Sequence, residues 1–201
     1  MTSPDNQPPQ PSPVPPAPKV TYINFLDSID VPKVKALMAL CTQVLTQHKP
    51  DVLYFLFSSQ GGQVNAGITL YHFLKGLPVK IVMHNTGSID SIATVIFLAG
   101  EERYAAYGTS FHFHGVGQQI NGQTRLNASA LSEMHSRLRE DEKKIAALVS
   151  RSTSLSQANL KKLFAQGEAK NLDFALEKGI IHEVRDVSIP RNAQLLSINL
   201  Q

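Results

Sequence analysis

The segment Asp51–Gly62, DVLYFLFSSQGG, is the part of the sequence that best indicates the fold. Its residues 51–58 are almost continuously apolar and have the length of a single strand, which is typical of a strand buried on both faces of a parallel sheet. A Gly61-Gly62 turn ends this run, and a helical pattern follows through Val64, Ile68, Tyr71 and Leu74. A strand, a turn and a helix in this order predict one unit of an α/β fold.

The same alternation of short strands and helices continues on both sides of this segment. Repeated strand–helix–strand units of this length imply parallel pairing with right-handed crossovers. The sequence patterns predict further strands over residues 20–26, 79–84 and 109–114, and helices over residues 31–47 and 91–99.

The second half of the chain is dominated by a long predicted helix over residues 127–152, with apolar residues near heptad spacing. Such a helix has two interpretations that the pattern does not separate: an arm for oligomerisation, or a helix packed on its own domain. A capping box of Ser154 and Gln157 predicts the start of the next helix. A short helix capped by Asn171 and a final strand over residues 180–184 are expected after it.

The chain of 201 residues is long enough for one folded domain, which we expect over residues 20–187. Eight of the twelve prolines lie in residues 1–19, and at that density a segment forms neither a helix nor a sheet ladder. Residues 1–19 are therefore expected to be a disordered tail, either an inert spacer or a ligand for a proline-binding module. Residues 188–201 are expected to form a C-terminal tail.

The composition is that of a globular protein, with 42% hydrophobic residues, 17% charged residues and a net charge of +3. The excess of positive charge is small and dispersed, so no nucleic-acid partner is expected. The longest apolar stretch, residues 92–99, is far shorter than the roughly 20 residues that span a bilayer, so no membrane partner is expected. The first ten residues lack the features of a secretory signal, and a cytoplasmic protein is expected. The single cysteine, Cys41, excludes an internal disulfide and is expected to be buried.

Three segments carry residue types that can perform chemistry. SSQGG, residues 58–62, ends a predicted strand with two glycines, where backbone N–H groups can approach a ligand closely. GSIDSIA, residues 87–93, begins with a predicted turn at Gly87 and sets Ser91 at the start of an apolar helix, where free N–H groups can stabilise an oxyanion. The third, FHFH, alternates so that His112 and His114 share one strand face.

Each segment also has a simpler structural interpretation. A diglycine is usually a turn, Ser91 can act as a helix cap, and strand histidines are usually structural. A histidine beside an activated serine can, however, accept its proton near neutral pH. His112 and His114 can instead bind a metal ion, but no third ligand is evident nearby, so neither a metal nor a cofactor is expected.

In their order and spacing, the three segments resemble the ClpP class of self-compartmentalised serine peptidases, within the wider ClpP/crotonase fold. The resemblance runs from about Val20 to Val184. GGQVNAGITLYHFLKG is similar to the family's Ser-Pro-Gly-Gly segment and helix, GSIDSIATVIFLAG looks like its nucleophile helix, and DFALEKGIIHEV resembles its terminal signature. The resemblance implies an α/β fold of repeated β-β-α units with a protruding long handle helix.

The resemblance also implies a role for each matching position. Ser91 would attack the peptide carbonyl, with His114 as general base and then general acid, and the backbone N–H groups of Gly62 and Ile92 would form the oxyanion hole. The substrate would be a peptide or an unfolded protein. Family members stack as two heptameric rings and work with a separate AAA+ ATPase. This chain has no G-x-x-x-x-G-K-[ST] phosphate loop, so unfolding power would come from such a partner.

The sequence departs from the family pattern at the acid that orients the histidine. The family's aspartate aligns near Gly167, and the adjacent Glu168 is the candidate third member of the site if the loop shifts by one residue. The alternatives are a Ser–His dyad without an acid, or a carboxylate from elsewhere in the chain. Gln60 replaces the proline of the Ser-Pro-Gly-Gly segment, and Gly115 follows His114 where the family has glutamine. An acid that fixes the histidine tautomer is commonly worth orders of magnitude in rate, so its loss permits slow or absent proteolysis.

The sequence therefore predicts a serine-type endopeptidase of a divergent branch of the family. Two alternatives stay open on the sequence alone. One is a catalytically weak or inactive ClpP-like scaffold subunit, and the other is a crotonase-type acyl-CoA enzyme.

Overall fold

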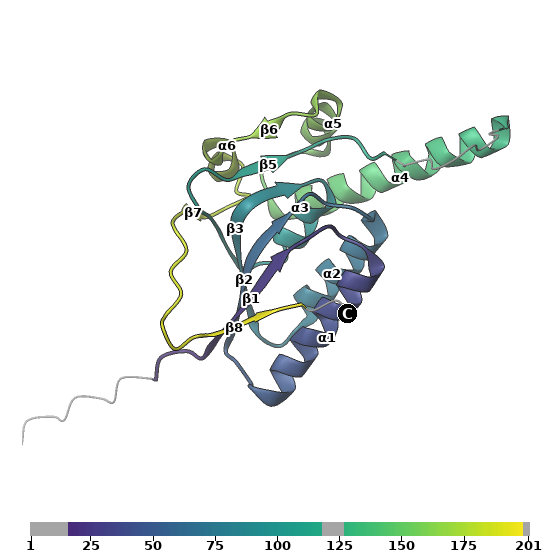
Figure 1. Ribbon diagram of the computed structural model, residues 1–201. Helices are drawn as coiled ribbons and strands as arrows, with labels where there is room; N and C mark the ends of the chain where they lie inside the picture. The colour runs from purple at the N-terminus through teal and green to yellow at the C-terminus, as the bar shows by residue number, and fades with distance from the viewer. Residues whose placement is uncertain (1–15, 118–126, 199–201) are drawn as a thin grey trace, which may run out of the picture.

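The computed structural model describes residues 16–117 and 127–198 and shows an eight-stranded sheet with helices packed against it (Figure 1). The strands are β1 (Val20–Leu26), β2 (Val52–Ser59), β3 (Lys80–Asp90), β4 (Glu102–Ala105), β5 (Ser110–His112), β6 (Ala169–Lys170), β7 (Glu183–Val184) and β8 (Gln194–Ser197). The helices are α1 (Val31–Gln47), α2 (Val64–Gly76), α3 (Ile92–Phe97), α4 (Ala128–Ser152), α5 (Gln157–Gln166) and α6 (Leu172–Glu177). Residues 1–15 of the proline-rich tail lie outside the described residues.

Strand β2 is the centre of the sheet, as its apolar run predicts. It pairs in parallel with β1 on one side and with β3 on the other, and most of its side chains are buried. The main sheet order is β6-β5-β3-β2-β1-β8, and every pairing is parallel except that of β5 with β6. Parallel pairing aligns the carboxyl ends of β2 and β3, so the segments that follow these two strands meet at one edge.

Strand β3 is longer than the sequence pattern predicts, and Gly87 lies inside it rather than in a turn. The first part of β3 pairs with β4, and residues 88–90 pair with β5, after a register shift against β2. A Cβ atom on Gly87 would lie 2.7 Å from Oγ of Ser58, so only glycine fits where the two strands approach. The prediction of a turn at Gly87 was wrong. A glycine that allows two strands to approach closely cannot be distinguished in the sequence from a glycine in a turn.

Helix α1 has the bounds that its periodicity predicts. Asp30 caps it by accepting a hydrogen bond from the N–H of Lys33 at 2.9 Å. The buried side of the helix carries the predicted apolar stripe, which includes Val34, Leu37, Cys41 and Val44. The stripe packs into the main hydrophobic core.

Cys41 is fully buried, which confirms the prediction, and burial raises the pKa of its thiol to about 12. We therefore expect the native protein not to react with a thiol reagent such as 5,5′-dithiobis(2-nitrobenzoic acid) near neutral pH, because both access and the thiolate form are lacking. One thiol per chain should react once the protein is denatured. Rapid reaction of the native protein would contradict this burial.

Helix α4 packs on its own domain through only one of its halves, so the second interpretation of the long helical pattern holds for that half. Its buried residues are Ile145, Ala146 and Val149, all in the C-terminal part, which packs against the domain. The N-terminal part projects away from the body (Figure 1), and Leu131 on it is half exposed. The projecting part matches the handle helix that the family resemblance implies.

The C-terminal part of the chain differs from the predictions in three places. The strand predicted over residues 180–184 is limited to β7, Glu183–Val184. The capping box before α5 is formed by Ser156 and Asn159, not by Ser154 and Gln157. Residues 194–197, expected in a tail, form β8, which pairs in parallel with β1 (Figure 1). Four residues are too short to give a clear alternating pattern, so the strand depends on the exposed edge of β1. Within the described ranges, none of the helices has the length and apolarity needed to cross a membrane.

Candidate active site

Ser91 occupies a strained turn between the end of β3 and the start of α3. Its φ of 56° and ψ of −128° lie in a region that residues other than glycine rarely adopt. The turn is held by its own N–H, which donates to the carbonyl of His112 at 2.9 Å, and by the N–H of Thr94, which donates to the Ser91 carbonyl at 3.1 Å. Such a turn presents the serine hydroxyl at the end of a buried strand, beside the unpaired N–H groups of a helix start.

The diglycine turn lies directly against Ser91. Gly61 has a φ of 85°, and a Cβ atom on it would lie 2.9 Å from Cβ of Ser91, so a side chain would push the Ser91 turn away. Gly62 has a φ of 148°, and a Cβ atom on it would overlap the carbonyl oxygen of Ile29. Both positions therefore require glycine, for backbone conformation as well as for space.

The N–H of Gly62 points away from β1 and its following loop. Ile29 forms a parallel bridge with Gly62, in which the Ile29 N–H donates to the Gly61 carbonyl at 2.8 Å and the Gln63 N–H donates to the Ile29 carbonyl at 2.7 Å. In such a bridge the N–H of the middle residue, Gly62, is directed to the opposite side. The N–H of Ile92, at the first position of α3, also lacks an intrahelical partner.

The alternation of the FHFH segment is confirmed. Phe111 and Phe113 are buried, while the rings of His112 and His114 lie on the other face with their centroids 5.1 Å apart. Nδ1 of His114 lies 2.8 Å from the carbonyl oxygen of Gly115. Because a carbonyl only accepts, Nδ1 carries the hydrogen and Nε2 keeps its lone pair, which is the form that a general base needs.

His112 has the opposite arrangement. Its Nε2 donates to the carbonyl oxygen of Gly167 at 3.0 Å, which ties β5 to the end of α5. Nε2 of this ring is therefore engaged with the backbone, and the histidine that retains a basic Nε2 is His114.

Ser91, His114 and the diglycine turn line one cavity with a volume of about 420 Å³. Its remaining walls are formed by Ser28, Gln60, Val64, Gly115, Val116 and Gly117. The three segments singled out in the sequence thus meet in space, although the chain between them spans two strands and two helices. A hydroxyl, an imidazole and the free N–H of Gly62 around one cavity form a set suited to acyl transfer, and Ile92 follows Ser91 directly in the chain.

Glu168, the predicted third member, has a different partner. Its carboxylate pairs with Nζ of Lys170 at 3.0 Å, and its side chain is 63% exposed. Gly167, in the left-handed conformation with a φ of 61°, ends α5 immediately before it. No hydrogen bond joins Glu168 to His114 within the described residues, where Nδ1 of His114 faces the Gly115 carbonyl instead.

Two further groups were not singled out from the sequence. The Gly115 carbonyl is a backbone group, and Glu142 lies in the mixed-charge run of α4, which looks like an ordinary solvated helix face. Oε1 of Glu142 accepts a hydrogen bond from the N–H of Val116 at 3.2 Å. No local sequence signal marks Glu142, because its relation to the site depends on how α4 packs beside the loop after β5.

Comparisons with known proteins agree with this fold. The sequence model of the family described as Clp protease matches residues 19–188. The chain is 24% identical over 152 residues to the ATP-dependent Clp protease proteolytic subunit 2 of Pseudomonas aeruginosa, covering 73% of this chain and 74% of that protein. Its fold is similar to that of a point mutant of ClpP1 from Listeria monocytogenes, with a TM-score of 0.66 and 18% identity over 84% of this chain and 92% of that chain.

Proposed function

Because this chain belongs to the Clp protease family, we propose that it is a serine-type endopeptidase that cleaves peptides or unfolded proteins inside an oligomeric chamber. The observation that carries the proposal is the cavity shared by Ser91, His114 and the Gly61-Gly62 turn. The tautomer of His114 also supports it, since Nε2 is available to accept a proton.

Acylation begins when Oγ of Ser91 attacks the carbonyl carbon of the scissile peptide bond. The hydroxyl proton passes to Nε2 of His114, and the carbonyl oxygen becomes an oxyanion. When the tetrahedral intermediate collapses, the C–N bond breaks and His114 gives its proton to the leaving amine. The products of this half-reaction are a free amino terminus and an ester on Ser91.

Deacylation repeats the same steps with water as the nucleophile. His114 accepts a proton from the water, the hydroxide attacks the ester carbonyl, and Oγ of Ser91 leaves with the proton from Nε2. The backbone N–H groups of Gly62 and Ile92 are assigned to the oxyanion in both halves. A donor of this kind typically contributes about 10²–10³ in kcat.

Assembly and partners are part of the same proposal. The projecting half of α4 carries Leu131 half exposed, and an equivalent face on a second copy would cover it. We assign this half of the helix to contacts between stacked rings, with heptamers as the family expectation. The name of the Pseudomonas relative includes ATP dependence, and a separate AAA+ ATPase is the matching partner proposed for this chain.

A fluorophosphonate probe tests the proposed function directly. The wild-type protein is expected to label covalently, and Ser91→Ala is expected to show no labelling, because the probe reacts only with an activated serine. Ser88→Ala is a suitable control, since Ser88 is a nearby hydroxyl whose side chain donates to Asp90. Equal labelling of wild type and Ser91→Ala would overturn the assignment of Ser91.

An inactive scaffold subunit is the second candidate function. It is favoured by one observation: within the described residues, no carboxylate contacts His114 directly. In that case the chain acts through assembly with active subunits, and purified wild-type protein neither labels nor hydrolyses peptides. Turnover of a small fluorogenic peptide that depends on Ser91 would eliminate this candidate.

A further inference from the structure

His114 and Glu142 both form hydrogen bonds with the peptide group between Gly115 and Val116. Nδ1 of His114 donates to the carbonyl oxygen of Gly115 at 2.8 Å. The N–H of Val116 donates to Oε1 of Glu142 at 3.2 Å. The Gly115 carbonyl and the Val116 N–H belong to the same planar peptide unit, so the imidazole and the carboxylate bind its two ends.

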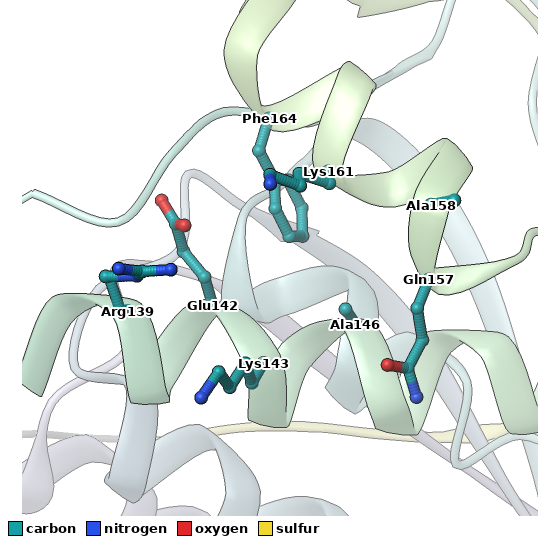
Figure 2. Close-up of a pocket in the computed structure, with 8 residues that line it drawn as sticks. All are labelled: Arg139, Glu142, Lys143, Ala146, Gln157, Ala158, Lys161 and Phe164. Atoms are coloured by element: carbon teal, nitrogen blue, oxygen red, sulfur yellow. The ribbon is translucent and has the colours of Figure 1, made fainter. Parts of the chain in front are cut away.

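The loop that follows β5 and contains Gly115 and Val116 is also held by α5. The N–H of Gly115 donates to the carbonyl oxygen of Phe164 at 3.1 Å. A Cβ atom on Gly115 would lie 3.1 Å from Oε1 of Glu142, so the loop lies close against the carboxylate. Figure 2 shows the side chain of Glu142 extending from α4 on the side where Phe164 of α5 lies. The peptide that holds His114 is thus fixed from both helices.

The charge of Glu142 is placed to act on this peptide. The residue is half-buried, and within the described residues it forms no ion pair with a lysine or arginine. It lines a groove between α4 and α5, of about 300 Å³, with three cationic side chains, those of Arg139, Lys143 and Lys161 (Figure 2). Glu142 shares this groove with the three cations, while its hydrogen bond goes to the Val116 N–H.

We propose that Glu142 is a positioning residue that replaces the missing triad acid by acting on His114 through the Gly115–Val116 peptide. This inference rests on the proposed peptidase function. An anionic acceptor at the N–H end of a peptide polarises the unit and makes its carbonyl oxygen a stronger acceptor. The Gly115 carbonyl then holds the Nδ1–H tautomer of His114 and stabilises the imidazolium formed when Ser91 gives up its proton. No proton leaves His114 through this relay.

Two substitutions separate the charge of Glu142 from its size. Glu142→Gln keeps an oxygen acceptor of the same length and removes the charge, whereas Glu142→Ala removes the acceptor. We expect Glu142→Gln to lower the rate of fluorophosphonate labelling by about 10- to 100-fold, which is typical for the loss of a residue that orients a functional histidine through hydrogen bonds. Glu142→Ala should lose at least as much. Glu140→Gln is the matched control, because Glu140 lies on the same helix, exposed and paired with Lys143, and it should keep the wild-type rate.

The pH dependence distinguishes an electrostatic role from a structural one. The proposed relay stabilises the imidazolium form, so removing the charge of Glu142 should move the acidic limb of the rate profile to lower pH, whereas loss of a purely structural contact should lower the rate without moving the limb. The other charged groups around this part of the site are unchanged in Glu142→Gln, so the shift reports Glu142 alone. They are His112 on β5, Arg139 and Lys143 on α4, Lys161 on α5, and Glu168 and Lys170 at β6.

A second readout does not require peptidase activity. Exchange of the imidazole Cε1 hydrogen in deuterated water, followed by mass spectrometry with fragmentation to resolve His112 from His114, reports the protonation of each ring as a function of pH. The His114 transition should move to lower pH in Glu142→Gln and stay in place in Glu140→Gln. If wild type fails to label but this shift is present, the proposed function fails and the relay stands.

Other outcomes overturn the relay. If Glu142→Gln keeps both the wild-type labelling rate and the wild-type His114 transition, the charge has no role. If only Glu142→Ala loses activity, Glu142 is a tether for the loop and not a replacement for the acid. Should Glu142→Ala fail to fold, the isosteric Gln variant and the exchange measurement still decide the question.

Discussion

Replacing His114 with alanine is expected to reduce peptide hydrolysis by about 10⁴-fold or more, because the serine then has no base. Structural effects should be small, since the ring is only partly buried and donates a single hydrogen bond to its neighbouring carbonyl. The measurement is kcat/KM with a fluorogenic peptide, together with the rate of fluorophosphonate labelling.

His112→Ala is the control for this experiment. The two histidines share a strand face, with ring centroids 5.1 Å apart. A nonspecific structural effect of removing an imidazole ring from this strand should therefore appear in both variants. Of the two, and within the part of the chain that the structure describes, only His114 has its Nε2 free of the backbone, because Nε2 of His112 donates to the Gly167 carbonyl. A loss in His112→Ala that equals or exceeds the loss in His114→Ala would show that the assignment of the base is wrong.

Gly62→Ala is expected to have the largest effect on stability among substitutions at the site. The new methyl group would occupy the position of the Ile29 carbonyl oxygen, at a φ of 148° that alanine rarely adopts. Backbone strain and overpacking together are expected to cost about 2–6 kcal/mol in the free energy of unfolding. Urea unfolding at a fixed protein concentration measures this cost, and any protein that remains folded should label slowly because the Gly62 N–H is displaced.

Gly76→Ala is the matched control for Gly62. Gly76 is the last residue of α2, and a Cβ atom on it would meet nothing within 4 Å. Alanine there should be neutral or should stabilise the protein by up to about 1 kcal/mol, because glycine is a poor helix former. If Gly62→Ala were as stable as Gly76→Ala and labelled at the wild-type rate, the proposed role of the diglycine turn would be refuted.

The sequence predicted well those parts of the structure that a local sequence pattern determines. The bounds of α1 follow from a regular apolar stripe, and the central position of β2 follows from its continuous apolar run. The meeting of Ser91 and His114 at one cavity follows from parallel pairing, which brings the carboxyl ends of strands together. In each case a local pattern and the fold require the same arrangement.

The failures concern residues whose role depends on contacts distant in the sequence. Gly87 was placed in a turn because its contact with Ser58 comes from another strand. Glu168 was chosen because it adjoins the aligned aspartate position, yet the left-handed Gly167 and the pairing with Lys170 give its carboxylate another partner. Glu142 approaches the loop that holds His114 only through the packing of α4, so a helix of mixed charge gave no indication of it.

The position of β8 has a practical consequence for working with this protein. The strand covers the outer edge of β1, from Thr21 to Asn24, and within the described chain it is the last element of that side of the sheet. A truncation that removes residues 194–198 would leave the backbone donors and acceptors of β1 open to strands from other molecules, which favours aggregation during purification. Affinity tags are therefore better attached to the N-terminal end, with the C-terminal strand left intact.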